Sequence, residues 1–107
     1  MAARKPSTRA GRRARGREQQ RLVRDQERLA ALEPGGAPER PLVVESAAQV
    51  EPKATAAPCP LCDGTVRLEA HEAESIGGDL LRVARVACTS CGVRRRRWVR
   101  LAAPLLN

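Results

Sequence analysis

Two matched cysteine pairs constrain this 107-residue chain more than any other feature. Cys59 and Cys62 stand in CPLC, Cys88 and Cys91 stand in CTSC, and the chain has four cysteines in all. Two residues inside each pair let a tight turn aim both sulfurs at one point. Four thiolates about 2.3 Å from one tetrahedral ion satisfy Zn²⁺ and leave no open coordination position. The spacing therefore predicts one structural zinc ion bound by all four cysteines.

Other uses of the cysteines fit the sequence less well. A dithiol redox pair needs a thioredoxin-like βαβ context, which the pattern lacks, and it needs no matching second pair. We expect an intracellular, reducing, cytoplasmic location, which disfavours disulfides, because neither a signal peptide nor a run of about eighteen apolar residues is found. An Arg-rich start free of acids until Glu18 also suits a mitochondrial transit segment. Iron is the alternative metal for the same thiolates.

The two ends of the chain differ in what they can fold into. Residues 1–17 combine Arg, Ala and Gly without a hydrophobic period, which predicts a disordered basic tail. Residues 18–33 lack Gly and Pro and carry Leu22, Leu29 and Leu32, which predicts a short amphipathic helix.

The middle of the chain is expected to connect these parts without a fold of its own. Residues 34–57 place prolines among Ala, Gly and Glu, which predicts a Pro/Ala-rich linker. The one apolar patch in it, LVVE at residues 42–45, is a candidate short docking strand.

The last fifty residues, 58–107, alternate in a way that predicts β structure. Strands are expected over residues 65–73, 80–87 and 93–101, and Gly77-Gly78 predicts a hairpin between the first two. The chain has one Trp and no Phe or Tyr, so large side chains for a core are nearly absent. A unit this small needs a metal or disulfides to outweigh its chain entropy. The expected fold is a small metal-stabilised, three-stranded antiparallel sheet.

The motifs CPLCDG and CTSCG, with a hairpin between them, resemble the zinc ribbon family over residues 58 to about 101. The resemblance implies a structural Zn²⁺ and the same four cysteine ligands. Ribbons of this family often have glycine directly after both pairs. Here Asp63 intervenes before Gly64, a departure expected to affect the type of turn rather than the set of ligands.

The densest positive charge of the chain follows the second cysteine pair, in VRRRRWVR. In an extended strand Arg95 and Arg97 share one face with Val99, and the other face carries Arg94, Arg96, Trp98 and Arg100. Charge on both faces predicts a solvated strand that cannot be central in a packed sheet. The alternative role of these charges is to prevent edge-to-edge aggregation.

The net charge of +8 indicates a polyanionic partner, and we expect nucleic acid or a ribonucleoprotein bound through arginine–phosphate contacts. The contacts are assigned to two groups of residues: Arg12, Arg13, Arg15 and Arg17 in the tail, and Arg94, Arg95, Arg96, Arg97, Trp98 and Arg100 in the last strand. Trp98 is expected to cover the sheet rather than stack on a base. A GC-rich genome would also enrich arginine, so composition alone does not separate these causes.

A protein-interaction or scaffold role is the alternative function, with the helix at 18–33 docking through its three leucines. We expect no catalysis, because the chain offers neither a nucleophile–base pair nor an open metal position. His71, the only histidine, is expected on the polar side of a strand. The acids near the hairpin are interpreted as solvated: Glu69, Glu72, Glu74 and Asp79. No membrane contact is expected.

Overall fold

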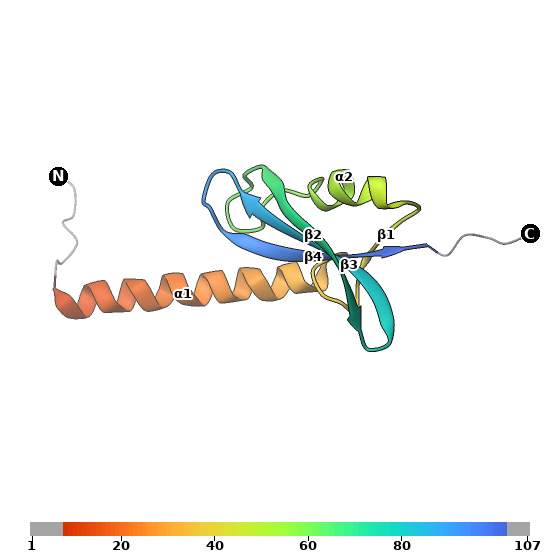
Figure 1. Cartoon of the computed structure of the whole chain (residues 1–107). Helices are drawn as coiled ribbons and strands as arrows, with labels where there is room; N and C mark the ends of the chain where they lie inside the picture. Colours follow the sequence, from red (N-terminus) through yellow and green to blue (C-terminus); the bar gives the residue numbers. More distant parts are fainter. Residues whose placement is uncertain (1–7, 103–107) are drawn as a thin grey trace, which may run out of the picture.

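The computed structural model describes residues 8–102, so residues 1–7 of the expected tail and 103–107 of the expected ribbon lie outside the described residues. The elements in chain order are α1 (Arg9–Leu32), β1 (Leu42–Val44), the 3₁₀ turn η1 (Ala47–Gln49), α2 (Val50–Ala54), β2 (Val66–Ile76), β3 (Asp79–Cys88) and β4 (Arg94–Leu101). Figure 1 shows the strands gathered with α2 at one end of the molecule, while α1 projects away from them.

The sheet has four strands in the order β1-β4-β3-β2, so the expectation of three strands is wrong. The three expected strands are present, and β3 pairs antiparallel with both β2 and β4. The fourth strand, β1, pairs parallel with β4, with Leu42 opposite Val99. It comes from the apolar patch that was a candidate docking strand. Its pairing joins residues far apart in the sequence, which no local pattern reports.

Strand β4 lies between β1 and β3, which contradicts the expectation of a solvated, non-central strand. The side chain that resolves the contradiction is Arg97, which is only 8% exposed. Its guanidinium donates hydrogen bonds to the carbonyl oxygens of Ala54, Ala57 and Pro58, at 2.5, 2.8 and 3.2 Å. A buried polar group is tolerated where its donors are matched by acceptors. One inward arginine of β4 is therefore a structural residue.

Helix α1 begins at Arg9, so residues 9–17, expected to be disordered, are helical. The Thr8 side chain caps the helix by accepting a hydrogen bond from the Gly11 N–H at 3.0 Å. Arginine and alanine are strong helix formers. This stretch carries no hydrophobic period, and the helix needs none here, because α1 buries none of its residues.

Residues 34–57 were expected to be a linker, but they contribute to the folded unit. Val44 is 4% exposed, and Val50 and Ala54 of this segment are fully buried. The segment also bonds to β4, because the Trp98 N–H donates to the Gly35 carbonyl at 3.0 Å. Single apolar residues among prolines carry no recognisable period, so only the folded chain shows that they share a core.

The core is made of small side chains. Its buried members are Val44, Val50, Ala54, Cys59, Val66, Ala84, Val86, Cys88 and Val99. Two of the four cysteines are thus part of the hydrophobic core. Because valine and alanine bury little area each, the core gains little free energy per residue, as the composition predicted.

Strand β2 contains an irregularity that changes the position of His71. The register with β3 shifts between Leu68 and Ala70, and beyond it His71 lies opposite Ala84. Leu68 lies opposite Val86, two residues from Ala84, so Leu68 and His71 share one face of the sheet. The expectation that His71 lies on the opposite, polar side is therefore wrong, because simple alternation does not survive a bulge.

Within residues 8–102, no helix combines the length and the apolar character needed to cross a membrane. Helix α1 has 24 residues, which is long enough, but its sequence is rich in arginine.

Replacing Arg97 by glutamine removes donors from three backbone carbonyls. We expect Arg97→Gln to lower the free energy of unfolding by about 2–4 kcal/mol, since buried acceptors left unpaired each cost about 1–3 kcal/mol. Arg100→Gln, at an exposed site of the same strand, is the control and is expected to change it by less than about 0.5 kcal/mol. Urea denaturation of the metal-loaded proteins measures both, and equal midpoints would contradict the role of Arg97.

Candidate metal centre

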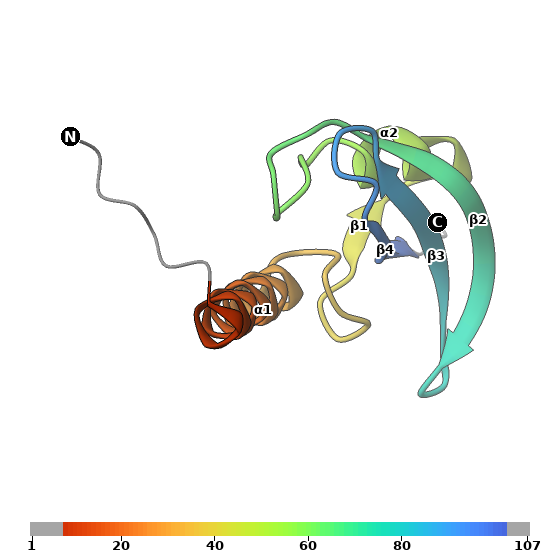
Figure 2. The same ribbon diagram turned by 90° about the vertical axis from the view of Figure 1, so that its left-hand side faces the viewer.

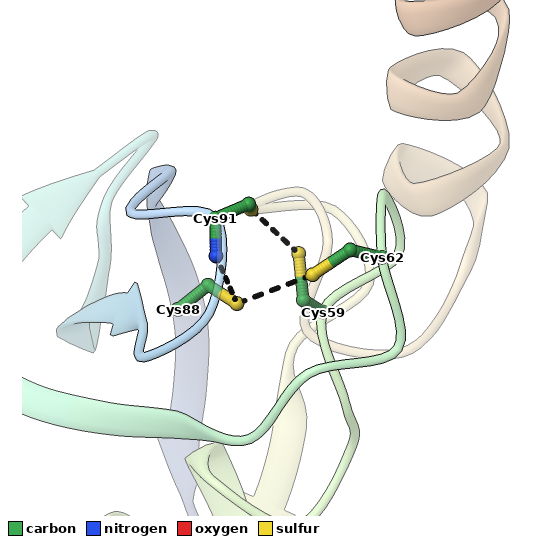
Figure 3. A group of neighbouring side chains, drawn as sticks. All are labelled: Cys59, Cys62, Cys88 and Cys91. Carbon is green, nitrogen blue, oxygen red and sulfur yellow. Dashed lines mark hydrogen bonds between the residues drawn. The ribbon is translucent and has the colours of Figure 1, made fainter.

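The sulfur atoms of all four cysteines converge on one point (Figure 3), and all lie within 4.8 Å of one another. Cys59 and Cys62 belong to the loop before β2, Cys88 ends β3, and Cys91 lies in the turn that leads to β4. The Cys59 and Cys91 sulfurs are 3.8 Å apart, and those of Cys62 and Cys88 are 3.4 Å apart. The predicted ligand set is brought together by the fold.

The size of this cluster fits one tetrahedral metal ion. Four sulfurs about 2.3 Å from a central ion are separated from one another by about 3.8 Å, close to the two distances between the loops. A disulfide needs about 2.05 Å, and all four cysteines are free thiols. Cys59 and Cys88 are buried, whereas Cys62 and Cys91 are exposed, so the site lies at the edge of the core.

The two cysteine loops repeat the same backbone hydrogen bonds. In the first loop the Asp63 N–H donates to the Cys59 carbonyl at 2.8 Å, and in the second the Gly92 N–H donates to the Cys88 carbonyl at 3.1 Å. The first cysteine of each loop also donates its N–H to the carbonyl five residues later, which is that of Gly64 in the first loop and Val93 in the second. The two loops therefore have equivalent backbone structures, and together they hold all four sulfurs around one point.

Asp63 and Gly92 occupy equivalent positions and both have positive φ, 61° and 77°. Aspartate is one of the few residues other than glycine that tolerate this region. The turn at Asp63 therefore matches the turn at Gly92 in the second loop, and the expected change in turn type does not occur. Gly64 serves a different purpose: a Cβ there would lie 2.8 Å from both the Cys88 sulfur and the Ser90 hydroxyl oxygen. In the sequence Gly64 is recognisable only as a turn glycine. The structure shows that the lack of a side chain at this position leaves room for the Cys88 sulfur.

Backbone donors stabilise a thiolate at Cys88. Its sulfur accepts hydrogen bonds from the N–H groups of Ser90 at 3.3 Å and Cys91 at 3.4 Å. These bonds, that from Cys91 first, lower the pKa of Cys88 to about 6. The hydrogen bond with Cys88 in turn raises the pKa of Cys62 to about 12. In this pair the proton belongs to Cys62, and metal ligation requires its release.

Arg97 connects the cysteine cluster to β4. Two of its acceptors are the carbonyls of Ala57 and Pro58, directly before Cys59. Burial lowers the pKa of Arg97, and Arg95 lowers it further, whereas Cys59 and Glu33 act in the opposite direction. A divalent metal ion bound by four thiolates would carry a net charge of −2, which a neighbouring guanidinium stabilises.

The other arginines of β4 have different environments. Arg95 is paired with Glu27 of α1 at 2.6 Å, and its side chain is 12% exposed. On the other face Arg94 pairs with Glu69 at 3.1 Å, while the Arg96 guanidinium lies 5.4 Å from the centre of the Trp98 ring. Trp98 itself is half-buried and lies opposite Val83 of β3, where it covers the sheet. The alternation of β4 predicted from the sequence therefore divides its arginines into inward and outward sets.

The remaining residues assigned to nucleic-acid binding are exposed: Arg12, Arg13, Arg15 and Arg17 on α1, and Arg94, Arg96 and Arg100 on β4. Two of the four acids near the hairpin form surface ion pairs: Glu72 with Arg85 at 3.2 Å, in addition to Glu69 with Arg94. Sequence reasoning missed the Glu27–Arg95 pair, because it joins two segments that no local pattern relates.

Compared with known proteins, the chain matches no family model, no curated protein and no solved structure. The likeness to zinc ribbons therefore rests on the two cysteine loops and the hairpin between them.

Serine in place of a cysteine ligand tests the cluster directly. We expect the purified protein to carry about one metal ion per chain and Cys62→Ser to lose most of it, because a neutral hydroxyl is a poor replacement for a thiolate. Ser90→Ala is the control, since Ser90 contributes its backbone N–H. Elemental analysis gives both values. Metal retained in full by Cys62→Ser would exclude this residue as a ligand.

A methyl group at position 64 tests the packing around the sulfurs. The Gly64→Ala side chain would displace the Cys88 sulfur, so we expect the affinity for the metal to fall about tenfold or more. The matched control is Gly16→Ala, where a Cβ meets nothing within 4 Å and alanine favours the helix. Competition with a chromophoric chelator measures the affinity. The steric explanation fails if the two variants bind metal equally well.

Proposed function

We propose that the chain is a non-catalytic zinc-binding module that holds a nucleic acid or a ribonucleoprotein through arginine–phosphate contacts. In this proposal one Zn²⁺ is bound by Cys59, Cys62, Cys88 and Cys91 and has a structural role. The separation of 3.8 Å between the Cys59 and Cys91 sulfurs supports this zinc site, because it equals the spacing expected between two ligands of one tetrahedral ion. Four thiolates leave zinc no open position for a substrate or water. Iron suits the same ligands, and elemental analysis distinguishes the two metals.

The distribution of exposed arginines supports a polyanionic partner. One group lies along α1, which contains eight arginines and three acids and buries none of its residues. A second group, Arg94, Arg96 and Arg100, lies on the outward face of β4. Arg97 is excluded from the contact surface because its guanidinium is buried and hydrogen-bonded to backbone. Each phosphate that an arginine neutralises releases counterions, which favours binding whatever the base sequence.

A second candidate function is docking on a protein, and a specific observation favours it. The side chains of Leu22, Leu29 and Leu32 on α1 are 58%, 64% and 60% exposed. Large apolar side chains gathered on one element are typical of interaction sites. In this alternative the helix binds a partner and the arginines provide solubility. The two candidates differ in their response to salt, because apolar contacts are not screened.

The salt dependence of binding is the test of the proposed function. We expect the zinc-loaded chain to bind nucleic acid with a log–log salt slope of about −0.9 per phosphate engaged on duplex DNA. Fluorescence anisotropy with labelled oligonucleotides between 50 and 300 mM salt measures the slope. A flat response, or no binding at the lowest salt, would overturn the proposal. A protein partner that survives nuclease and high salt would favour the second candidate.

A further inference from the structure

We propose that α1 binds duplex DNA through a single stripe of arginines along one side of the helix. The stripe consists of Arg13, Arg17, Arg21, Arg24 and Arg28, and Arg9, four residues before Arg13, continues it toward the start of the helix. This inference rests on the proposed function and names, within it, the kind of nucleic acid and the surface that contacts it.

The spacing of the stripe places its members in one row. Successive arginines are four, four, three and four residues apart, and such neighbours lie on the same face of a helix. All five are exposed. Fifteen residues separate the first from the last, so at 1.5 Å per residue the row is about 22 Å long.

The other two arginines assigned to this part of the chain lie outside the stripe. Arg15 is two residues from both Arg13 and Arg17, which places it roughly opposite them, since each residue turns the helix by about 100°. Arg12 is one residue from Arg13 and five from Arg17, which also places it off the row. The helix therefore sorts its basic residues into one continuous row and isolated positions, a distinction that composition does not make.

The stripe lowers the stability of α1, and its side chains take no part in packing. Like charges four residues apart destabilise a helix by about 0.2–0.5 kcal/mol per pair. The first turn has no acidic residue to offset the positive end of the helix dipole. Within residues 8–102, the one ion pair that involves the stripe joins Arg28 to Asp25 at 3.8 Å, and both side chains are largely exposed. A row of phosphates would remove the repulsion, so binding and helix stability should be coupled.

Most of α1 is free of the folded body. Figures 1 and 2 show the helix projecting from the sheet, close to it only at its C-terminal end. There Glu27 pairs with Arg95 of β4. Glu27 follows Arg24 by three residues and lies about 80° around the helix from the middle of the row, so the row flanks the contact with β4 at its C-terminal end rather than pointing directly at it. A rod held at one end can enter a groove without a clash between the body and the nucleic acid.

The shape of α1 favours duplex DNA over other nucleic acids. A helix with its side chains is about 10–12 Å across, which fits the major groove of B-form DNA, about 12 Å wide. The major groove of duplex RNA is deep and narrow. Single strands are bound largely by stacking on aromatic side chains. The chain has one aromatic residue, Trp98, and Arg96 lies over its ring.

The test uses the full zinc-loaded chain and three double variants with equal loss of charge. Arg17→Gln with Arg21→Gln interrupts the stripe. Arg12→Gln with Arg15→Gln removes two arginines from the same helix, off the stripe. Arg40→Gln with Arg67→Gln removes two exposed arginines outside α1 and β4. Glutamine and arginine have similar helix propensities, so the helix itself is preserved. Anisotropy with a 20-base-pair DNA duplex, the equivalent RNA duplex and single-stranded DNA gives affinity and salt slope.

We expect the stripe variant to lose about tenfold or more in affinity for duplex DNA and to flatten the salt slope by about 2, one unit per lost phosphate contact. The same-helix variant should lose less, and the third variant should stay within about threefold of wild type. Circular dichroism at 222 nm should show helicity rising when DNA is added to wild type and rising less for the stripe variant.

Three results would overturn the inference while leaving the proposed function standing. One is an equal loss in the stripe variant and the same-helix variant. Another is binding of RNA duplex or single-stranded DNA as tight as that of duplex DNA. The last is an unchanged affinity in the stripe variant. If wild type bound none of the three nucleic acids at low salt, the proposed function would fail as well.

Discussion

The convergence of four sulfurs on one point is the constraint on which the rest of the sheet depends. The core around it is made of valine and alanine, with two of the cysteines among its buried members. Side chains of this size bury too little area to hold a small domain against its chain entropy. Two loops with equivalent hydrogen bonds present the sulfurs, one before β2 and one after β3. A shared ion would therefore tie the ends of the hairpin together at the edge of this core.

Arg97 shows how a strand with four consecutive arginines becomes the centre of a sheet. Strand alternation sends Arg97 inward, where three carbonyls from α2 and the segment after it accept its hydrogen bonds. Two of these carbonyls directly precede Cys59, so the same guanidinium links β4 to the first cysteine loop. Arg95, also inward, is neutralised by Glu27 of α1. The arginines beside the thiols thus have different roles. Arg97 supports the first cysteine loop, Arg95 contacts α1, and the outward arginines remain exposed.

The local parts of the fold were predictable from the sequence, and the distant contacts were not. The cysteine spacing identified the four residues that the fold brings together, and period-two alternation with Gly77-Gly78 located β2, β3 and β4 to within three residues at each end. Helix α2 was not predicted, and β1 was predicted only as a candidate docking strand, because five and three residues among prolines carry no period and the pairing of β1 with β4 is long-range. The first half of α1 was not predicted for a related reason. A helix that buries nothing needs no hydrophobic face, so only helix propensity and the Thr8 cap indicate it.

The sequence by itself determined the chemistry: which residues can ligate a metal, how large a core can be, and where positive charge is concentrated. These properties follow from residue type and from spacing within a few positions. The tertiary structure alone decided which arginine of β4 is buried, which strand pairs in parallel with β4, and where α1 is held against the sheet. Each of these depends on what lies across from a residue in space. Partners separated by dozens of positions leave no trace in any window of the chain.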